Sequence, residues 1–377
     1  MTWIDSAHEG AVAPQGRATA IQFGPFHLDL AAELLPPEPE RRRDEAEWLL
    51  LLGSYRYGDA RGALAYAQRQ DEMARLQTPE FTAQACSRSC EAHLLAGQFP
   101  QALADLDHQA GFEPFPGVPV LSDIEGNTAM NRALVLSHLG RWEEAEQARE
   151  RARSRADALG LCFAQPDILM RLLELHLLRL AAETLALNAQ FGAQVVQVAA
   201  QMHADWARCM AQPDAELLAR LQAAKARRRA WGERWHETEV LGQLASASLR
   251  CGDLAGAGDA IESGLAHARA KGEGRDLAEL WRLRGDLNLQ RGDSRAAASD
   301  YRQAIELARS QHSLLYALRA STSLAQLLAQ QGASAEAGAL LDAALEGLDH
   351  DAGLVDLSEA LALRRRLRPE GGLGPGR

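Results

Sequence analysis

The chain has 377 residues, a formal net charge of −11 and only 5% aromatic residues. Alanine and leucine dominate and β-branched residues are sparse, which favours helices and argues against a strand-rich fold, whose pleated faces need Val, Ile, Thr and aromatic side chains. The negative charge gives no general attraction to polyanions, so we expect no nucleic-acid binding.

Residues 1–40 differ in pattern from the rest of the chain and are expected to form a largely irregular N-terminal extension. The segment from Phe23 to Leu35 resembles the opening strands of winged-helix DNA-binding domains of bacterial response regulators. Pro36, Pro37 and Pro39 and then a helical repeat follow where the recognition helix of such a domain should be. The resemblance therefore does not predict DNA binding.

Two features predict the location of the protein. The first residues include Asp5 and Glu9 and contain no apolar run that could serve as a signal peptide or a membrane span. The five cysteines are odd in number and embedded in helical pattern, which suits a reducing compartment better than a disulfide framework. We therefore expect a cytoplasmic protein that does not bind a membrane.

Beyond the extension, the sequence repeats itself. A glycine in a short polar turn is followed five residues later by an alanine, and recurrence of this kind is typical of repeat arrays. Gly252, Gly292 and Gly332 are 40 residues apart, and the three earlier glycines are 39 and 43 apart. Where Asp follows the glycine, as in Gly292–Asp293, we interpret the pair as a helix C-cap followed by the next N-cap, and not as a calcium site. The pairs are Gly58 with Ala63, Gly97 with Ala102, Gly140 with Ala145, Gly252 with Ala257, Gly292 with Ala297, and Gly332 with Ala337.

Each repeated unit reads as a pair of helices. Positions eleven, seven and four residues before each glycine lie on one stripe of a helix with about 3.6 residues per turn. The middle position of this stripe is small in five of the six units, as in Gly285 and Ala325, which is expected where a neighbouring helix approaches closely. A second stripe follows each glycine, as in Ala297, Tyr301 and Ala304. A lone hairpin cannot bury both stripes, so the units must stack on one another.

Trp281, Gly285, Gly292, Ala297, Tyr301 and Ala304 stand at the spacing of the tetratricopeptide repeat, and the chain resembles that family over roughly residues 44–366, most clearly over 236–345. The unit is longer than the usual repeat of about 34 residues and lacks its closing proline. In this respect it looks like repeats in the C-terminal regions of large bacterial signal-transduction ATPases and nucleotide cyclases. The resemblance implies an all-α fold: a right-handed superhelical solenoid of about seven or eight antiparallel helical hairpins.

Three stretches interrupt the regular pattern. Residues 111–126 contain Pro114, Pro116 and Pro119 and cannot be helical throughout, so we expect a long loop that is either a surface excursion or a lid over the groove. Residues 161–235 keep helical pattern but lose the turn signature. We therefore expect divergent repeats there, between N-terminal repeats in 41–160 and C-terminal repeats in 236–368. Residues 369–377 are expected to be a disordered tail.

Candidate catalytic and metal-binding motifs are few. Cys86, Cys90 and His93 share one helical face and could in principle ligate a metal, but they coincide with the packing stripe, where a free cysteine behaves as a small hydrophobe. Residues 235–240 begin like a zinc-protease helix, with Val240 in place of the second histidine. The sequence also lacks a phosphate-binding loop and a nucleophile elbow. We predict a protein that is not an enzyme and holds no metal or cofactor.

The first helix of each hairpin lines the inner surface in tetratricopeptide proteins. By this resemblance, first-helix residues outside the packing stripe should face a groove. Arginines beside aromatic and amide side chains suit a peptide that carries a carboxylate, because guanidinium pairs with carboxylate through two hydrogen bonds. The groove candidates are Trp48, Tyr55, Asn127, Met130, Glu279, Arg282, Asp286, Arg319 and Gln326.

The resemblance implies that this protein binds a protein or peptide segment. One hypothesis is a passive adaptor that holds a partner in the groove. A second is a regulatory sensor, in which a bound peptide or ligand changes the pitch of the superhelix and so controls a transcription or signalling partner. The sequence leaves open who the partner is and whether two solenoids associate as a homo-oligomer.

Overall fold

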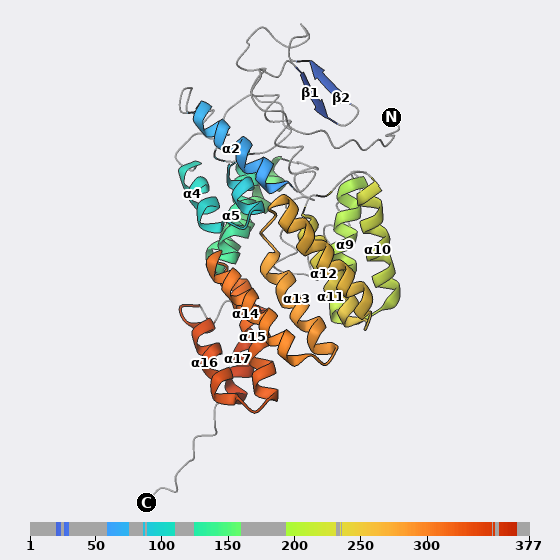
Figure 1. Ribbon diagram of the computed structural model, residues 1–377. Coiled ribbons are helices and arrows are strands. Elements are labelled where there is room, and N and C mark those ends of the chain that lie inside the picture. The colour runs from blue at the N-terminus through green and yellow to red at the C-terminus, as the bar shows by residue number, and fades with distance from the viewer. Residues whose placement is uncertain are drawn as a thin grey trace, which may run out of the picture.

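The computed structural model describes residues 20–23, 26–29, 59–74, 86, 89–109, 124–159, 194–230, 234, 236–348, 350 and 354–367. Almost all of them are helical (Figure 1). Residues 89–95 are also helical, and the labelled helices are α2 (Ala60–Ala74), α4 (Phe99–Gln109), α5 (Ile124–His138), α6 (Trp142–Leu159), α9 (Gln194–Ala211), α10 (Ala215–Ala230), α11 (Glu237–Arg250), α12 (Leu254–Lys271), α13 (Leu277–Gln290), α14 (Ser294–Ser310), α15 (Leu314–Gln330), α16 (Ser334–Leu345) and α17 (Val355–Leu367).

The described residues form six helical hairpins in which consecutive helices pack against each other. Residues 89–95 pair with α4, and the other pairs are α5 with α6, α9 with α10, α11 with α12, α13 with α14, and α15 with α16. Each first helix also packs on the first helix of the next hairpin across the series α9, α11, α13, α15 and α17. The prediction of an all-α solenoid of antiparallel hairpins is therefore confirmed.

The turns within the hairpins form as the glycine signature predicts. Gly292 has a φ of +86°, a left-handed conformation that costs glycine little because it has no Cβ. The carboxylate of Asp293 then accepts a hydrogen bond from the backbone N–H of Ala296 at 2.9 Å and caps α14. Asp253 caps α12 in the same way, through the N–H of Gly256 at 2.8 Å. Each turn thus ends one helix and begins the next within three residues.

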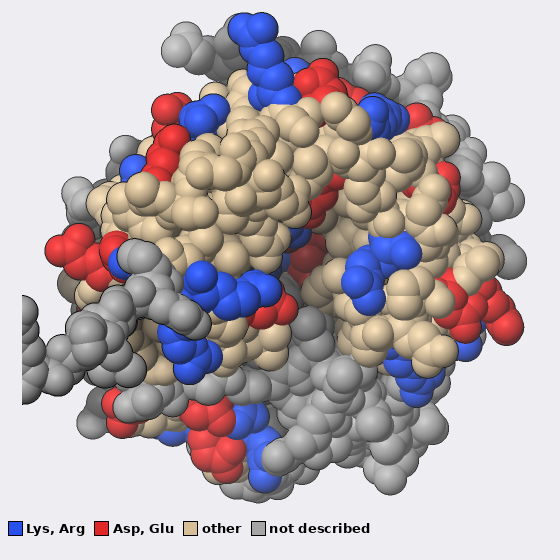
Figure 2. All heavy atoms as spheres, turned by 90° about the horizontal axis from the view of Figure 1, so that it is seen from below, with Lys and Arg blue, Asp and Glu red and all other residues tan. Residues whose placement is uncertain are grey.

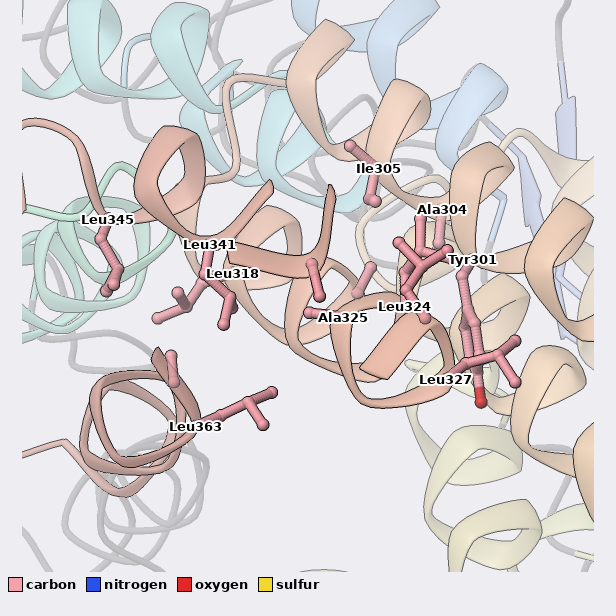
Figure 3. Packing of buried hydrophobic residues seen from close by; sticks show 14 of the residues in the cluster. Tyr301, Ala304, Ile305, Leu318, Leu324, Ala325, Leu327, Leu341, Leu345 and Leu363 are labelled. Atoms are coloured by element: carbon pink, nitrogen blue, oxygen red, sulfur yellow. The ribbon is translucent and has the colours of Figure 1, made fainter. Parts of the chain in front are cut away.

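The core between hairpins is built by the two predicted stripes. Tyr301 is 1% exposed and lies in a cluster with Leu324, Ala325 and Leu341 from the following hairpin (Figure 3). Gly285 leaves room for the Tyr301 ring, since a Cβ at this position would lie 2.6 Å from the ring carbon Cδ1. The Tyr301 ring of the second stripe therefore requires a small residue at position 285, in the middle of the first stripe.

The N-terminal hairpins fold back onto the C-terminal ones, a contact that the repeat pattern did not predict. Helix α5 packs on α15, as Figure 1 shows for the green and orange-red helices. The backbone N–H of Gly274 donates to the carbonyl of Leu95 at 3.0 Å, and the side chain of Gln311 donates to the carbonyl of Gly274 at 2.7 Å. Farther along, Arg61 donates to the carbonyl of Arg269 at 2.8 Å. We call the described residues between 59 and 159 the N-terminal arm, and we call its contact with the α12–α13 and α14–α15 turns the arm junction.

The interrupting stretches differ in part from expectation. The extension 1–40 contains an antiparallel hairpin of β1 (Ala20–Phe23) and β2 (Phe26–Asp29), with Ala20 opposite Asp29. Residues 124–126 of the expected loop 111–126 belong to α5, so the loop ends earlier than predicted. Most of that loop, residues 161–193 of the divergent region, and the tail 369–377 lie outside the described residues. None of the described helices combines the length and apolarity that a membrane span requires.

Candidate functional site

Three of the predicted groove residues lie together on α13. The guanidinium of Arg282 donates to both carboxylate oxygens of Glu279, at 2.9 and 2.7 Å, and through Nη1 to Asp286 at 2.7 Å. Nη1 also lies 3.4 Å from the hydroxyl of Ser323 on the next first helix. Burial opposes the charge of Arg282, but the two carboxylates outweigh burial and raise the pKa of this guanidinium well above its ordinary value. Every nitrogen of the guanidinium is thus already hydrogen-bonded within the chain.

Arg319 on α15 is held in a similar way by a residue that the sequence analysis did not select. Its Nε and Nη2 atoms donate to the two oxygens of Asp356 on α17, both at 2.9 Å. Burial alone would raise the pKa of Asp356, but the charge and hydrogen bonds of Arg319 lower this pKa below its ordinary value. Gln326, two turns farther along α15, is exposed.

The remaining candidates do not extend this group. Met130 on α5 is 1% exposed, so this side chain belongs to the core and is not available on an open groove. Asn127 is also in α5, but its side chain lies outside what the structure describes, as do Trp48 and Tyr55. The burial of Met130 thus argues against its place in an open groove, whereas the assignments of Trp48, Tyr55 and Asn127 stay predictions.

Polar contacts join α9 to α11, α13 to α15 and α15 to α17, and they include residues beyond the predicted ones. The ring nitrogen Nε2 of His203 lies 2.9 Å from Glu239, and the indole of Trp206 donates to Ser246 at 2.8 Å. We call this set of residues the inner polar band; it comprises His203, Trp206, Glu239, Ser246, Glu279, Arg282, Asp286, Arg319, Ser323 and Asp356. The residues that join neighbouring first helices are 36 to 41 positions apart, which is about one repeat. A search for polar pairs one repeat apart could therefore have found those that were missed.

At the N-terminal ends of α13 and α15, the band meets the arm junction. His138 of the arm stacks on Phe99, with ring centroids 4.0 Å apart, and its Nδ1 lies 3.1 Å from the hydroxyl of Ser313, the N-cap of α15. The ring of Tyr316 meets His138 edge-on, and its hydroxyl donates to Asp276 at 2.6 Å. Burial, with smaller contributions from Arg275 and Arg319, holds the pKa of His138 well below its ordinary value. The junction is therefore closed around a neutral imidazole.

A buried ion pair links this junction to the start of the band. Arg275 is fully buried and donates to Asp276 at 3.0 Å and to Glu239 on α11. Burial would raise the pKa of Glu239, but Arg275 and then His203 reverse the effect and lower it well below its ordinary value. Arg275 and Asp276 thus connect the α9–α11 part of the band to Tyr316 at the arm junction.

The charged side chains of the band are paired with one another, and among the described residues no group of three or more His, Cys, Asp or Glu side chains could hold a metal ion. His93, one of the three residues weighed as metal ligands, instead lies 2.7 Å from the Asp105 carboxylate. Figure 2 shows a hollow near the middle of the face seen from below, with acidic and basic atoms lying deep between uncharged surfaces.

No protein-family profile matches the sequence, and no curated protein matches it. Among solved structures, the chain is similar to the Rap protein complexed with Competence and Sporulation Factor, with 14% identity, a TM-score of 0.52, and coverage of 86% of this chain and 96% of that one. The anaphase-promoting-complex component Cut9, in the Cut9–Hcn1 hetero-tetramer, gives 11% identity and a TM-score of 0.46 over 88% of this chain and 60% of that one. A signal-transduction ATPase with a tetratricopeptide repeat sensor from Pyrococcus horikoshii gives 14% identity and a TM-score of 0.39 over 82% and 53%. The Rap similarity shows the fold of a tetratricopeptide-repeat solenoid.

Proposed function

We propose that this solenoid is a non-catalytic scaffold that binds a protein or peptide segment along the inner polar band. The supporting observation is that Glu279, Arg282 and Asp286 meet one another on α13 and connect, through Ser323, to the first helix that carries Arg319. The Rap protein, which shares the fold over most of both chains, was solved in complex with Competence and Sporulation Factor. A band of half-buried, exchangeable ion pairs gives specificity to a bound segment, because a wrong ligand would leave a charge unpaired.

The charges of the band favour a segment with basic side chains. Arg282 is flanked by two carboxylates, those of Glu279 and Asp286, so the group carries surplus negative charge. A ligand carboxylate would have to displace one of these internal partners, whereas a ligand lysine or arginine can approach without breaking an existing pair. The proposed ligand therefore has the opposite charge from the one expected when the arginines were considered without their partners.

Two arginines provide a matched test of the binding face. Arg319 pairs through two hydrogen bonds with Asp356 in the band, and Arg364 pairs in the same manner with Asp342, which lies on the second helix α16. Both pairs anchor α17, but the Arg319 pair is the more buried, so circular dichroism and thermal unfolding must first show that each variant keeps its fold. Peptides displayed as a library and selected on the purified protein should be enriched in lysine and arginine. Arg319→Glu should change affinity for the selected peptides by about tenfold or more, and Arg364→Glu should change it less than about twofold. Equal effects, or enrichment of acidic peptides, would contradict the proposal.

The arm junction supports the sensor hypothesis as a second candidate. One of the contacts between the arm and the C-terminal hairpins gathers His138, Ser313 and Tyr316, and Tyr316 is linked through Asp276 and Arg275 to Glu239 of the band. A ligand that competes for this network would release or tighten the arm and change the overall shape. Small-angle scattering with and without a selected peptide separates the hypotheses: an altered radius of gyration supports the sensor, and an unchanged radius at saturation supports the adaptor.

A further inference from the structure

Two cysteines from successive repeats are in direct contact. Cys209 lies in the last turn of α9 and is fully buried, whereas Cys251 is the C-cap of α11 and is partly exposed. Their sulfur atoms are 3.6 Å apart, although the residues are 42 positions apart in the sequence. The pair therefore occupies equivalent places at the C-terminal ends of two neighbouring first helices.

The surrounding contacts hold the two thiols in place. The same helices, α9 and α11, are joined by the His203–Glu239 contact at 2.9 Å and the Trp206–Ser246 hydrogen bond at 2.8 Å. The thiol of Cys251 also lies 3.5 Å from the carbonyl of Asp214 in the α9–α10 turn. Because the helices are fixed at two other points, each thiol meets the other at a high effective concentration.

A bond between the two sulfurs requires only a small movement. A disulfide is about 2.05 Å long, so the sulfurs must approach by roughly 1.6 Å. Cys251 lies just beyond the last residue of α11 and is followed by Gly252, which has a φ of +77° and open space around the position that a Cβ would take. Gly252 thus poses no steric barrier to a small shift of this turn.

We propose that Cys209 and Cys251 are a modification site, at which a hydroperoxide converts the two thiols into a disulfide that locks the α9–α10 hairpin to the α11–α12 hairpin. The more exposed Cys251 sulfur attacks one peroxide oxygen as a thiolate, the O–O bond breaks, and the second oxygen leaves as water or alcohol after taking a proton. The sulfur of Cys209, having given up its proton, then attacks the sulfenic acid on Cys251 and releases water. Two thiols are oxidised and one hydroperoxide is reduced.

The order of attack follows from exposure. Burial raises the pKa of the Cys209 thiol, which leaves this sulfur protonated and shielded from an oxidant in solution. Cys251 is accessible, and once its sulfenic acid forms, the neighbouring thiol is the nearest nucleophile. The cross-link would fix the rotation between two repeats, and in a solenoid that rotation sets the curvature of the inner face.

The test uses the full chain treated with hydrogen peroxide and then digested without reduction. We expect a cross-linked peptide pair containing Cys209 and Cys251, an intact mass lower by two hydrogens, and loss of two alkylatable thiols that dithiothreitol restores. Cys251→Ser should abolish the cross-link, and a Cys86→Ser/Cys90→Ser variant should keep it. Circular dichroism at 222 nm verifies that the Cys251→Ser variant keeps its helical fold. Accumulation of sulfinic acid on Cys251 with no cross-link, or linkage to another cysteine, would overturn the proposal.

Discussion

The contact between Gly285 and Tyr301 allows a quantitative test of how the hairpins pack. In the helix alone, Gly285→Ala should stabilise by about 1 kcal/mol, because alanine has the higher helix propensity. In the folded protein the added methyl would lie 2.6 Å from Tyr301 Cδ1 and nearer still to Cε1. The ring cannot turn away without loss of its hydrogen bond to Asp286 at 2.7 Å, since it is 1% exposed and surrounded by the core. Overpacking costs about 1–3 kcal/mol and a lost hydrogen bond about 1 kcal/mol more, so the net loss should be about 2 kcal/mol.

Gly242→Ala on α11 is the matched control for this prediction. A Cβ there would lie 3.8 Å from Leu283 and 3.9 Å from Leu280, which is ordinary contact, so the helix-propensity gain should appear undiminished. Urea unfolding followed by circular dichroism at 222 nm, on the two variants and wild type in parallel, measures the difference. Combining Gly285→Ala with Tyr301→Leu should recover part of the loss. If Gly285→Ala is as stable as Gly242→Ala, the close-packing argument is refuted.

Three further predictions concern the C-terminal helix, the arm junction and its pH dependence. Asp356→Asn should weaken the bidentate pair with Arg319 by about 1–2 kcal/mol and speed amide exchange in α17, as read by hydrogen–deuterium exchange. Because the pKa of His138 is depressed in the folded chain, the unfolded chain binds a proton there that the folded chain does not. The free energy of unfolding should therefore fall by up to about 2 kcal/mol from pH 7 to pH 5. His138→Phe should make this pH dependence weaker, as measured by thermal unfolding at each pH. Gly140→Ala should lower the free energy of unfolding by about 1 kcal/mol more than Gly332→Ala. Both glycines have a positive φ, but only at Gly140 would a Cβ lie 2.8 Å from an α15 side chain. Equal urea midpoints for the two variants would argue against the arm junction.

The sequence alone determined the features that depend on neighbours within one repeat. The Gly292–Asp293 pair predicts its turn because left-handed backbone and helix capping are local properties. The small residue at Gly285 and the aromatic residue at Tyr301 are sixteen positions apart, and hairpin geometry makes them meet in every unit of this kind. Likewise Glu279, Arg282 and Asp286 share one helical face by their spacing, so their meeting could be predicted.

The tertiary structure decided which charges are paired and where the N-terminal arm contacts the C-terminal hairpins. Arg319 acquires Asp356 only because α17 stacks on α15, and Met130 is buried in an arm that folds back onto distant hairpins. The arm junction brings His138 beside Ser313 although they are 175 residues apart. Such contacts depend on the total rotation along the array, which is the sum of the small rotations between neighbouring repeats. The repeat pattern specifies the form of each unit, but it specifies these small rotations only weakly.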